Sequence, residues 1–286
     1  LLLDRQVRFL RRAFSFYVAP DIVKKLEQNP DQLRLGGELR DMSFVFTDLA
    51  NFTSLIESLR PEEGGRLLNS YLDGMIDIAK SHGGTIDKII GDAVVVLFAA
   101  PVLQPSHAEQ ALACALAMDD FAVKFATEQH VKGIPFGDTR IGVHSGTAIV
   151  GNFGGSDFFD YTAHGDAVNT TARLESLNKQ LGTRIAVSGS TVKRCASFEG
   201  RAVGSLILKG KENPIDVFAP VNSGSADEEL VSRYEHAYSL MADNKRQALK
   251  EFQCLASDFP CDPLTQFHRV RLMRGETGTI ITLNEK

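Results

Sequence analysis

Residues 85–98 read TIDKIIGDAVVVLF, which is two apolar runs, Thr85 to Ile90 and Ala93 to Phe98, on either side of Gly91 and Asp92. A Gly-Asp pair between two strand-like runs is typical of a β-hairpin with a tight turn. The two strands are then antiparallel neighbours, and Asp92 lies at the tip of the hairpin. This stretch therefore predicts a sheet built from antiparallel pairs, with an acidic side chain at one edge.

A second aspartate ends another strand-like run. Residues 42–48 are mostly apolar and finish at Asp48. A suitable register would bring Asp48 and Asp92 to one point at the edge of the sheet, and two carboxylates there form a hard, oxygen-rich site for a divalent metal. Two plainer interpretations stay open, since Asp48 could cap the next helix and Gly91-Asp92 could be a turn without function.

The rest of the central region alternates between helical and strand-like patterns. Helices are expected from Pro61 to Ala79, from Ser106 to about His130 and from Asp166 to Leu181. Strands are expected at 138–144, 148–153 and 184–187, with further strands ending at Leu208 and Phe218. Helices mixed with hairpins indicate an α+β domain with a mostly antiparallel sheet.

The two ends of the chain have a different character. Residues 1–39 predict a helix, a turn at Pro20 and a second helix, a connector to the domain at 40–222. Ser223-Gly224-Ser225 marks a boundary, and residues 223–286 predict a small C-terminal helical appendage. Because the chain starts on leucines without an initiator Met, we expect a piece of a longer protein that follows a membrane segment.

Composition narrows the class of protein. The 286 residues are 43% hydrophobic with a formal net charge of −5, as in soluble globular proteins. The sequence shows no basic patch, so a nucleic-acid partner is not expected. The four cysteines are scattered without a CxxC pair, which indicates reduced thiols and neither a disulfide framework nor a zinc site. No run approaches the ~18 apolar residues that span a bilayer.

Five motifs occur in a fixed order along the chain. They are FTDLANFT at 46–53, DKIIGDA at 87–93, GVHSG at 142–146, YTAHGDAVNTTARLE at 161–175 and LKGK at 208–211. In order and spacing, residues 40–220 resemble the catalytic domain of class III nucleotidyl cyclases, the adenylate and guanylate cyclase family. The resemblance implies a ferredoxin-like α+β fold and an active site shared between the subunits of a head-to-tail homodimer.

The resemblance also implies roles for one half of the site. Asp48 and Asp92, with the carbonyl of Leu49, are expected to hold two Mg²⁺ or Mn²⁺ ions that activate the ribose 3′-hydroxyl and neutralise the triphosphate. The amides around Phe52 and Thr53, at a helix N-terminus, are expected to bind the β and γ phosphates.

The other half is implied to come from the partner chain. Arg173 would stabilise the charge that develops on the α-phosphate, Asn169 would position the ribose, and Lys209 would bind the terminal phosphates. No protein general base is evident. Catalysis would then rest on positioning and electrostatics.

Substrate choice follows from one pair of residues in the family. Lysine with aspartate or threonine accompanies adenine, whereas glutamate with cysteine accompanies guanine; here the pair is Lys88 and Thr162. The resemblance thus implies an adenylate cyclase, a phosphorus–oxygen lyase that makes cyclic AMP and pyrophosphate from ATP. The alternatives are a guanylate cyclase, a degenerate nucleotide-binding regulatory module, and a plain interaction protein built on the C-terminal helices.

Two further points follow from the resemblance. Asn51 stands where the family usually has glycine, and asparagine is the replacement that costs least if this position needs a positive φ. Residues 14–23 resemble the segment that precedes the cyclase domain in bacterial sensor cyclases. That likeness implies a cytoplasmic location, as the signal-transducing end of a membrane-anchored protein with an upstream sensor domain.

Overall fold

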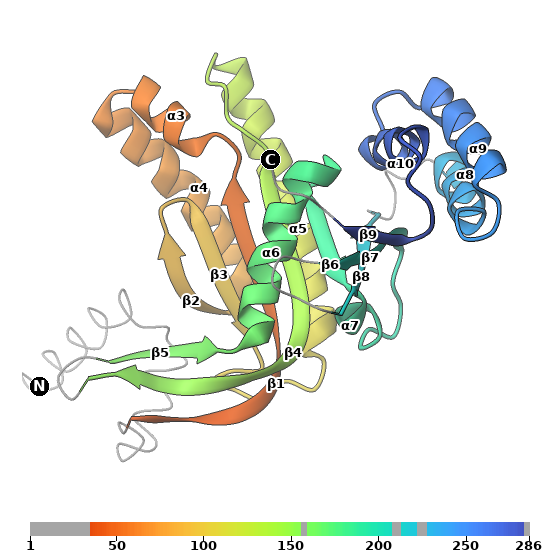
Figure 1. The fold of residues 1–286 in the computed structure, drawn as a ribbon. Helices are drawn as coiled ribbons and strands as arrows, with labels where there is room; N and C mark the ends of the chain where they lie inside the picture. The colour runs from red at the N-terminus through yellow and green to blue at the C-terminus, as the bar shows by residue number, and fades with distance from the viewer. Residues whose placement is uncertain (1–34, 156–158, 208–212, 222–227, 283–286) are drawn as a thin grey trace, which may run out of the picture.

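The computed structural model describes residues 35–155, 159–207, 213–221 and 228–282 (Figure 1). Of the predicted helical connector at 1–39, residues 1–34 lie outside these residues, as does the predicted phosphate-binding Lys209, whereas Gly36 to Leu39 belong to a strand. Within the described residues, no helix combines the length and the apolar content that crossing a membrane requires.

One nine-stranded sheet organises the molecule, in the order β2-β3-β1-β4-β6-β8-β7-β9 with β5 paired to β4. All neighbouring strands are antiparallel except β4–β6 and β7–β9, which confirms the predicted α+β fold with a mostly antiparallel sheet. The strands are β1 Gly36–Leu49, β2 Thr85–Ile90, β3 Ala93–Phe98, β4 Thr139–Gly154, β5 Phe159–His164, β6 Ile185–Ser188, β7 Gly200–Ile207, β8 Ile215–Pro220 and β9 Ile280–Thr282.

The helices begin and end close to the predicted positions, because Pro residues favour helix starts and Gly residues favour helix ends. Pro61 lies at the start of α4, and Gly182, with a φ of 71°, follows the last residue of α6. The helices are α3 Phe52–Ser58, α4 Pro61–Ser81, α5 His107–Val131, α6 Asp166–Leu181, α7 Gly189–Val192, α8 Glu228–Ser239, α9 Lys245–Asp258 and α10 Pro263–Met273.

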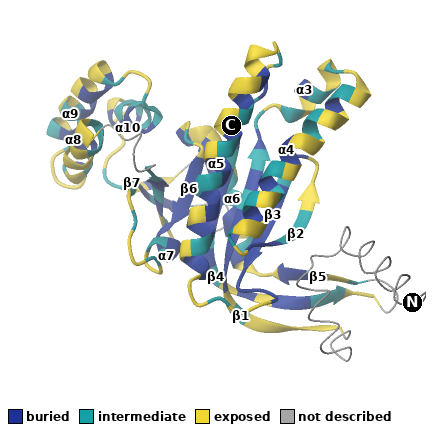
Figure 2. Ribbon diagram, turned by 180° about the vertical axis from the view of Figure 1, so that it is seen from behind, coloured by how far each residue is buried: buried dark blue, intermediate teal, exposed yellow. Residues whose placement is uncertain are grey.

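The two faces of β1 pack against different helices. Val45 belongs to a cluster with residues of α4 and α5, such as Tyr71 and Met118. Phe44, one position earlier, belongs to a second cluster with Ala167 of α6. This alternation follows from the two-residue period of a strand, and it places α6 on the opposite face of the sheet from α4 and α5 (Figures 1 and 2).

One boundary prediction was wrong. The expected strands at 138–144 and 148–153 are the single strand β4. It pairs with the whole length of β1, from Gly36 opposite Asn152 to Leu49 opposite Thr139. Gly146 does not end the strand. It makes room for α6 instead, because an added Cβ there would lie 3.3 Å from the Cβ of Ala167.

The C-terminal helices share a hydrophobic cluster with the sheet. Leu174 and Leu177 of α6 lie in the same cluster as Phe252 and Leu255 of α9. The chain then returns to the sheet as β9, which pairs in parallel with β7 and which the sequence pattern did not predict. The division of the chain at residue 223 remains a prediction, but these helices and the α6 side of the sheet are built on one apolar core.

Candidate active site

Asp48 and Asp92 meet at one edge of the sheet. Asp48 is the penultimate residue of β1, and Asp92 lies in the turn between β2 and β3. The backbone N–H of Leu49 donates a hydrogen bond of 2.7 Å to Oδ2 of Asp92. The antiparallel pairing of β1 with β3 therefore brings the two aspartates together, as the sequence pattern suggested.

A cation and a third carboxylate complete this acidic edge. Arg140 forms an ion pair with Asp48, and its Nε lies 3.3 Å from Oε1 of Glu175. Burial, with the charge of Asp48 adding to it, raises the pKa of Glu175 to about 7. Burial also raises the pKa of Asp92, and again the nearby charge of Asp48 acts in the same direction. The edge thus holds more negative charge than Arg140 alone balances.

The donor set fits a hard divalent cation. Among the described residues, no group of three or more His, Cys, Asp or Glu side chains could form a metal cage. Mg²⁺ commonly needs no such cage, since it binds through one or two carboxylates and completes its shell with water and substrate phosphates. Asp48 and Asp92, two carboxylates close enough that the charge of Asp48 raises the pKa of Asp92, match that mode of binding.

The turn after β1 starts the helix α3 in an unusual conformation. Asn51 occupies the N-cap position with a φ of 60° and a ψ of 22°, in the left-handed region. Position 51 therefore has the positive φ that the sequence analysis named as a condition, and asparagine tolerates it better than most residues. Asp48 does not cap the helix, and Phe52 and Thr53 form its first turn beside the acidic edge.

A second group of polar residues joins β2 to β5. Lys88 Nζ donates a hydrogen bond of 3.2 Å to Oγ1 of Thr162, so the structure brings the two predicted purine-reading residues into contact. Asp87 joins them, because its Oδ2 lies 3.3 Å from Lys88 Nζ. Thr162 is 5% exposed and the Asp87 side chain 4%. Sequence reasoning gave Asp87 no role.

The helix α6 carries the remaining predicted residues. Asn169 is exposed and Arg173 half-buried, one turn apart on one face of the helix. Within the ranges that the structure describes, Arg173 forms no ion pair, and no hydrogen bond joins it or Asn169 to the aspartates. The helix can approach β4 because Gly142 has no side chain: an added Cβ would lie 2.4 Å from the carbonyl oxygen of Thr171.

Sequence reasoning missed Arg140 as a member of the site and gave Glu175 no role within it. Arg140 lies directly opposite Asp48 in the pairing of β1 with β4. The sequence does show a charged residue, Arg140, near the start of a predicted strand. Its pairing with Asp48 can be inferred only once the register of β1 with β4 is known.

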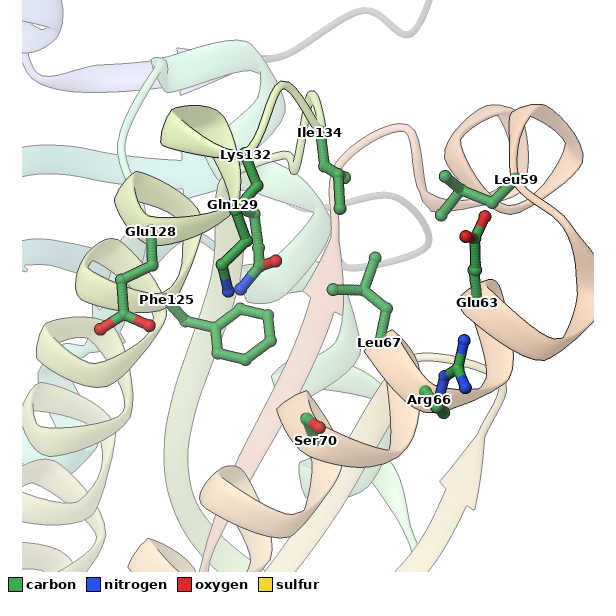
Figure 3. Close-up of a pocket in the computed structure, with 10 residues that line it drawn as sticks. All are labelled: Leu59, Glu63, Arg66, Leu67, Ser70, Phe125, Glu128, Gln129, Lys132 and Ile134. Carbon is green, nitrogen blue, oxygen red and sulfur yellow. The ribbon is translucent and has the colours of Figure 1, made fainter.

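The site does not coincide with the pocket shown in Figure 3. That pocket has a volume of about 560 Å³ and lies between α4 and the C-terminal end of α5. Leu67, Phe125 and Ile134 form apolar parts of its wall, and Glu63, Arg66 and Lys132 are charged residues around it. None of the predicted site residues lines it.

Comparisons with known sequences agree with this geometry. A sequence model of the family described as "Adenylate and Guanylate cyclase catalytic domain" matches residues 37–219. The chain is 35% identical over 212 residues to "Adenylate cyclase 1" of Rhizobium meliloti (strain 1021), a match that covers 73% of this chain and 31% of that protein. It is 33% identical over 224 residues to "Adenylate cyclase" of Anabaena cylindrica, covering 76% of this chain and 42% of that protein.

Solved structures give the same result. The crystal structure of the adenylyl cyclase CyaB from P. aeruginosa superposes with a TM-score of 0.61 at 33% identity, covering 66% of this chain and 97% of that one. The guanylyl cyclase Cya2 superposes with a TM-score of 0.59 at 32% identity, covering 68% of this chain and 98% of that one. Cyclases with either named substrate therefore share this fold.

Proposed function

The chain belongs to the adenylate and guanylate cyclase catalytic domain family, and from this membership we propose that it is an adenylate cyclase. The reaction is the conversion of ATP to 3′,5′-cyclic AMP and pyrophosphate. The observation that carries the choice of ATP is the contact between Lys88 and Thr162, the pair that accompanies adenine in this family. Two similar proteins that bear the name adenylate cyclase support it.

The acidic edge is proposed to bind the metal and the phosphates. Asp48 and Asp92, with the carbonyl oxygen of Leu49, would hold two Mg²⁺ or Mn²⁺ ions. Such ions, when bound, lower the pKa of the ribose 3′-hydroxyl and neutralise the triphosphate. The backbone amides of Phe52 and Thr53 would donate hydrogen bonds to the β and γ phosphates.

The α6 face is proposed to act on the substrate bound by a second copy of the chain. In a head-to-tail homodimer, Arg173 would donate hydrogen bonds to the α-phosphate as the 3′-oxygen attacks in line and pyrophosphate leaves. Asn169 would position the ribose, and Lys209 would bind the terminal phosphates. These residues stabilise charge that develops in the transition state, which is how proteins accelerate phosphoryl transfer.

The purine is proposed to be recognised by hydrogen bonds along its edge. Lys88 would donate to N1 of adenine, and the Thr162 hydroxyl would accept from the exocyclic amine. Guanine presents a donor at N1 and an acceptor at O6, the reverse pattern. A guanylate cyclase is therefore the less favoured activity.

The setting of the domain is also a proposal. The chain spans 31% and 42% of the lengths of the two relatives named above, so further segments are expected in the whole protein. We place this part in the cytoplasm, as the signal-transducing end of a membrane-anchored protein with an upstream sensor.

Product analysis tests the proposal directly. The purified chain is incubated with ATP or GTP, each with Mg²⁺ or Mn²⁺, at several protein concentrations, and cyclic nucleotides are quantified. We expect cyclic AMP in excess over cyclic GMP, with a specific activity that rises with protein concentration as dimers form. Predominant cyclic GMP would favour the guanylate cyclase alternative, and nucleotide binding without any cyclic product would favour the degenerate regulatory module.

A further inference from the structure

We propose that Asp87 is a specificity-determining positioning residue, which holds the hydroxyl proton of Thr162 so that Thr162 presents only an acceptor to the purine. This inference rests on the proposed function, because it concerns how the same site distinguishes ATP from GTP. It assigns a role to a buried carboxylate that the cyclase mechanism above does not use.

A β-bulge brings Asp87 to the purine-reading pair. Along β2, Ile86 pairs with Val96 and Lys88 with Val95, so the register shifts and Asp87 is the extra residue. In a regular strand, neighbouring side chains point to opposite faces. The bulge changes the direction of one of them, and as a result Asp87 and Lys88 lie together, with 3.3 Å between Oδ2 and Nζ.

The Asp87 carboxylate is buried at a cost that its two partners offset. Its side chain is 4% exposed, and burial raises its pKa, while hydrogen bonding from Thr162 and the charge of Lys88 act against that rise. Its Oδ1 has no hydrogen-bond partner among the described residues. A buried, incompletely paired carboxylate reduces stability, and we attribute its presence here to the orientation of Thr162.

Counting protons fixes the direction of the hydrogen bonds. A carboxylate only accepts, so the hydrogen bonding from Thr162 that opposes the rise in the pKa of Asp87 uses the single hydroxyl proton of Thr162. Lys88 is a donor only, and it donates to Oγ1 of Thr162. The oxygen of Thr162 then has a lone pair left and no proton to give.

The edge that faces the base is therefore polarised. Lys88 has donors to spare and Thr162 has an acceptor, which matches N1 and the exocyclic amine of adenine. Guanine would place its O6 acceptor against the oxygen of Thr162, and two acceptors repel. Without Asp87, the hydroxyl of Thr162 can turn and donate to O6, so discrimination against GTP should weaken.

The test is the ratio of kcat/KM for ATP to kcat/KM for GTP in Asp87→Asn. The amide can donate to Thr162, which then can donate to the base, and we expect the ratio to fall about tenfold, as for the loss of one well-placed hydrogen bond. The control is Asp160→Asn. Asp160 is exposed on β5 and its charge also acts on Asp87, so this variant makes the same charge change without the hydrogen bond, and the ratio should stay near the wild-type value.

A double variant with Thr162→Val tests whether Asp87 acts by positioning Thr162 or by a general structural effect. If Asp87 acts through Thr162, then Asp87→Asn should leave the ratio unchanged once Thr162→Val is present. Asp87→Ser, a smaller neutral variant whose hydroxyl can donate, is measured in parallel in case the Asn variant folds poorly. Additive effects of the Asp87 and Thr162 substitutions would overturn the inference.

The outcomes distinguish this inference from the proposed function. A wild-type chain that makes no cyclic nucleotide, or that prefers GTP, overturns the proposed function and the inference with it. A wild-type chain that prefers ATP and keeps its ratio in both Asp87 variants leaves the proposed function standing and overturns the role of Asp87.

Discussion

The acidic edge and the α6 face differ in how their charges are satisfied. At the acidic edge, Asp48 pairs with Arg140, and Asp92 accepts a hydrogen bond from the backbone of Leu49. On α6, Asn169 is exposed, and Arg173 forms no ion pair within the described ranges. One region is held in place by its own chain, whereas the other presents polar groups outward. That difference agrees with the proposed active site shared between two copies.

The two regions also rest on different parts of the hydrophobic core. The acidic edge lies over the cluster that contains Val45, Leu49 and Tyr71. The helix α6 shares its cluster with the C-terminal helices. The position of the α6 face therefore depends on residues more than 70 positions further along the chain, such as Phe252.

The largest effect is expected at the acidic edge. Asp48→Ala removes a proposed metal ligand and should reduce cyclase activity on the order of 10³-fold or more, because metal coordination supplies several kcal/mol of transition-state stabilisation. The measurement is cyclic AMP formation under saturating Mg²⁺ or Mn²⁺. Asp77→Ala, at an exposed position of α4, is the matched control and should retain wild-type activity. Near-normal turnover in Asp48→Ala would show that the metal assignment is wrong.

A slightly smaller loss is expected on the α6 face. Arg173→Ala should lower kcat by about 10²–10³-fold, as when one donor to a transition-state oxyanion is removed. Arg194→Ala provides the control, since Arg194 is an exposed arginine that pairs with Asp41 and has no proposed role in catalysis. Equal losses of activity in the two arginine variants would contradict a specific role for Arg173.

The shared core should show in stability. Phe252 is fully buried in the α6 cluster, and Phe252→Ala should lower the free energy of unfolding by about 3–5 kcal/mol, measured with urea. Val131→Ala shortens the side chain of a residue that is 84% exposed, and it should change the free energy of unfolding little. A loss below about 1 kcal/mol in Phe252→Ala, or a separate early transition, would indicate that the C-terminal helices fold independently of α6.

The smallest effect concerns the excess negative charge of the acidic edge. The pKa of Glu175 is raised from 4.5 to about 7, so the folded chain binds more protons than the unfolded chain between these values. The free energy of unfolding should therefore fall as pH rises through this window, and the loss persists above it. Glu175→Gln cannot ionise and escapes this loss.

The measurement for Glu175 is urea unfolding in EDTA at pH 4.5 and pH 8. The difference between Glu175→Gln and wild type should shift in favour of the variant by about 1–2 kcal/mol from the lower pH to the higher one. Equal differences at the two pH values would show that Glu175 is not held near the other carboxylates in the metal-free chain.

Local signals in the sequence were enough to predict most elements of the fold. The hairpin at 85–98 and the helices α4, α5 and α6 have boundaries set by Pro, Gly and apolar periodicity, which act within a few residues. The continuation of β4 through Gly146 and the return of the chain as β9 depend on α6 and β7, elements distant in sequence. A local sequence pattern cannot predict contacts between elements that are distant in sequence.

The candidate site divides in the same way. Asp48, Asp92, Lys88 and Thr162 could be named because they stand in motifs, and the structure brings each pair together. The contacts of Arg140 and Asp87 were not predictable. The contact of Arg140 depends on the register of β1 with β4, and that of Asp87 on a bulge in β2. Neither the register nor the bulge can be predicted from the local sequence.

Mixing two inactive variants tests the central claim most directly. Asp48→Ala and Arg173→Ala chains are each assayed alone and then after co-expression with different affinity tags. In random pairing, half of the dimers are mixed and each mixed dimer holds one intact site, so about a quarter of wild-type activity is expected for a two-fold symmetric dimer. Activity no greater than that of the two variants measured separately would contradict a site built from the acidic edge of one chain and the α6 face of another.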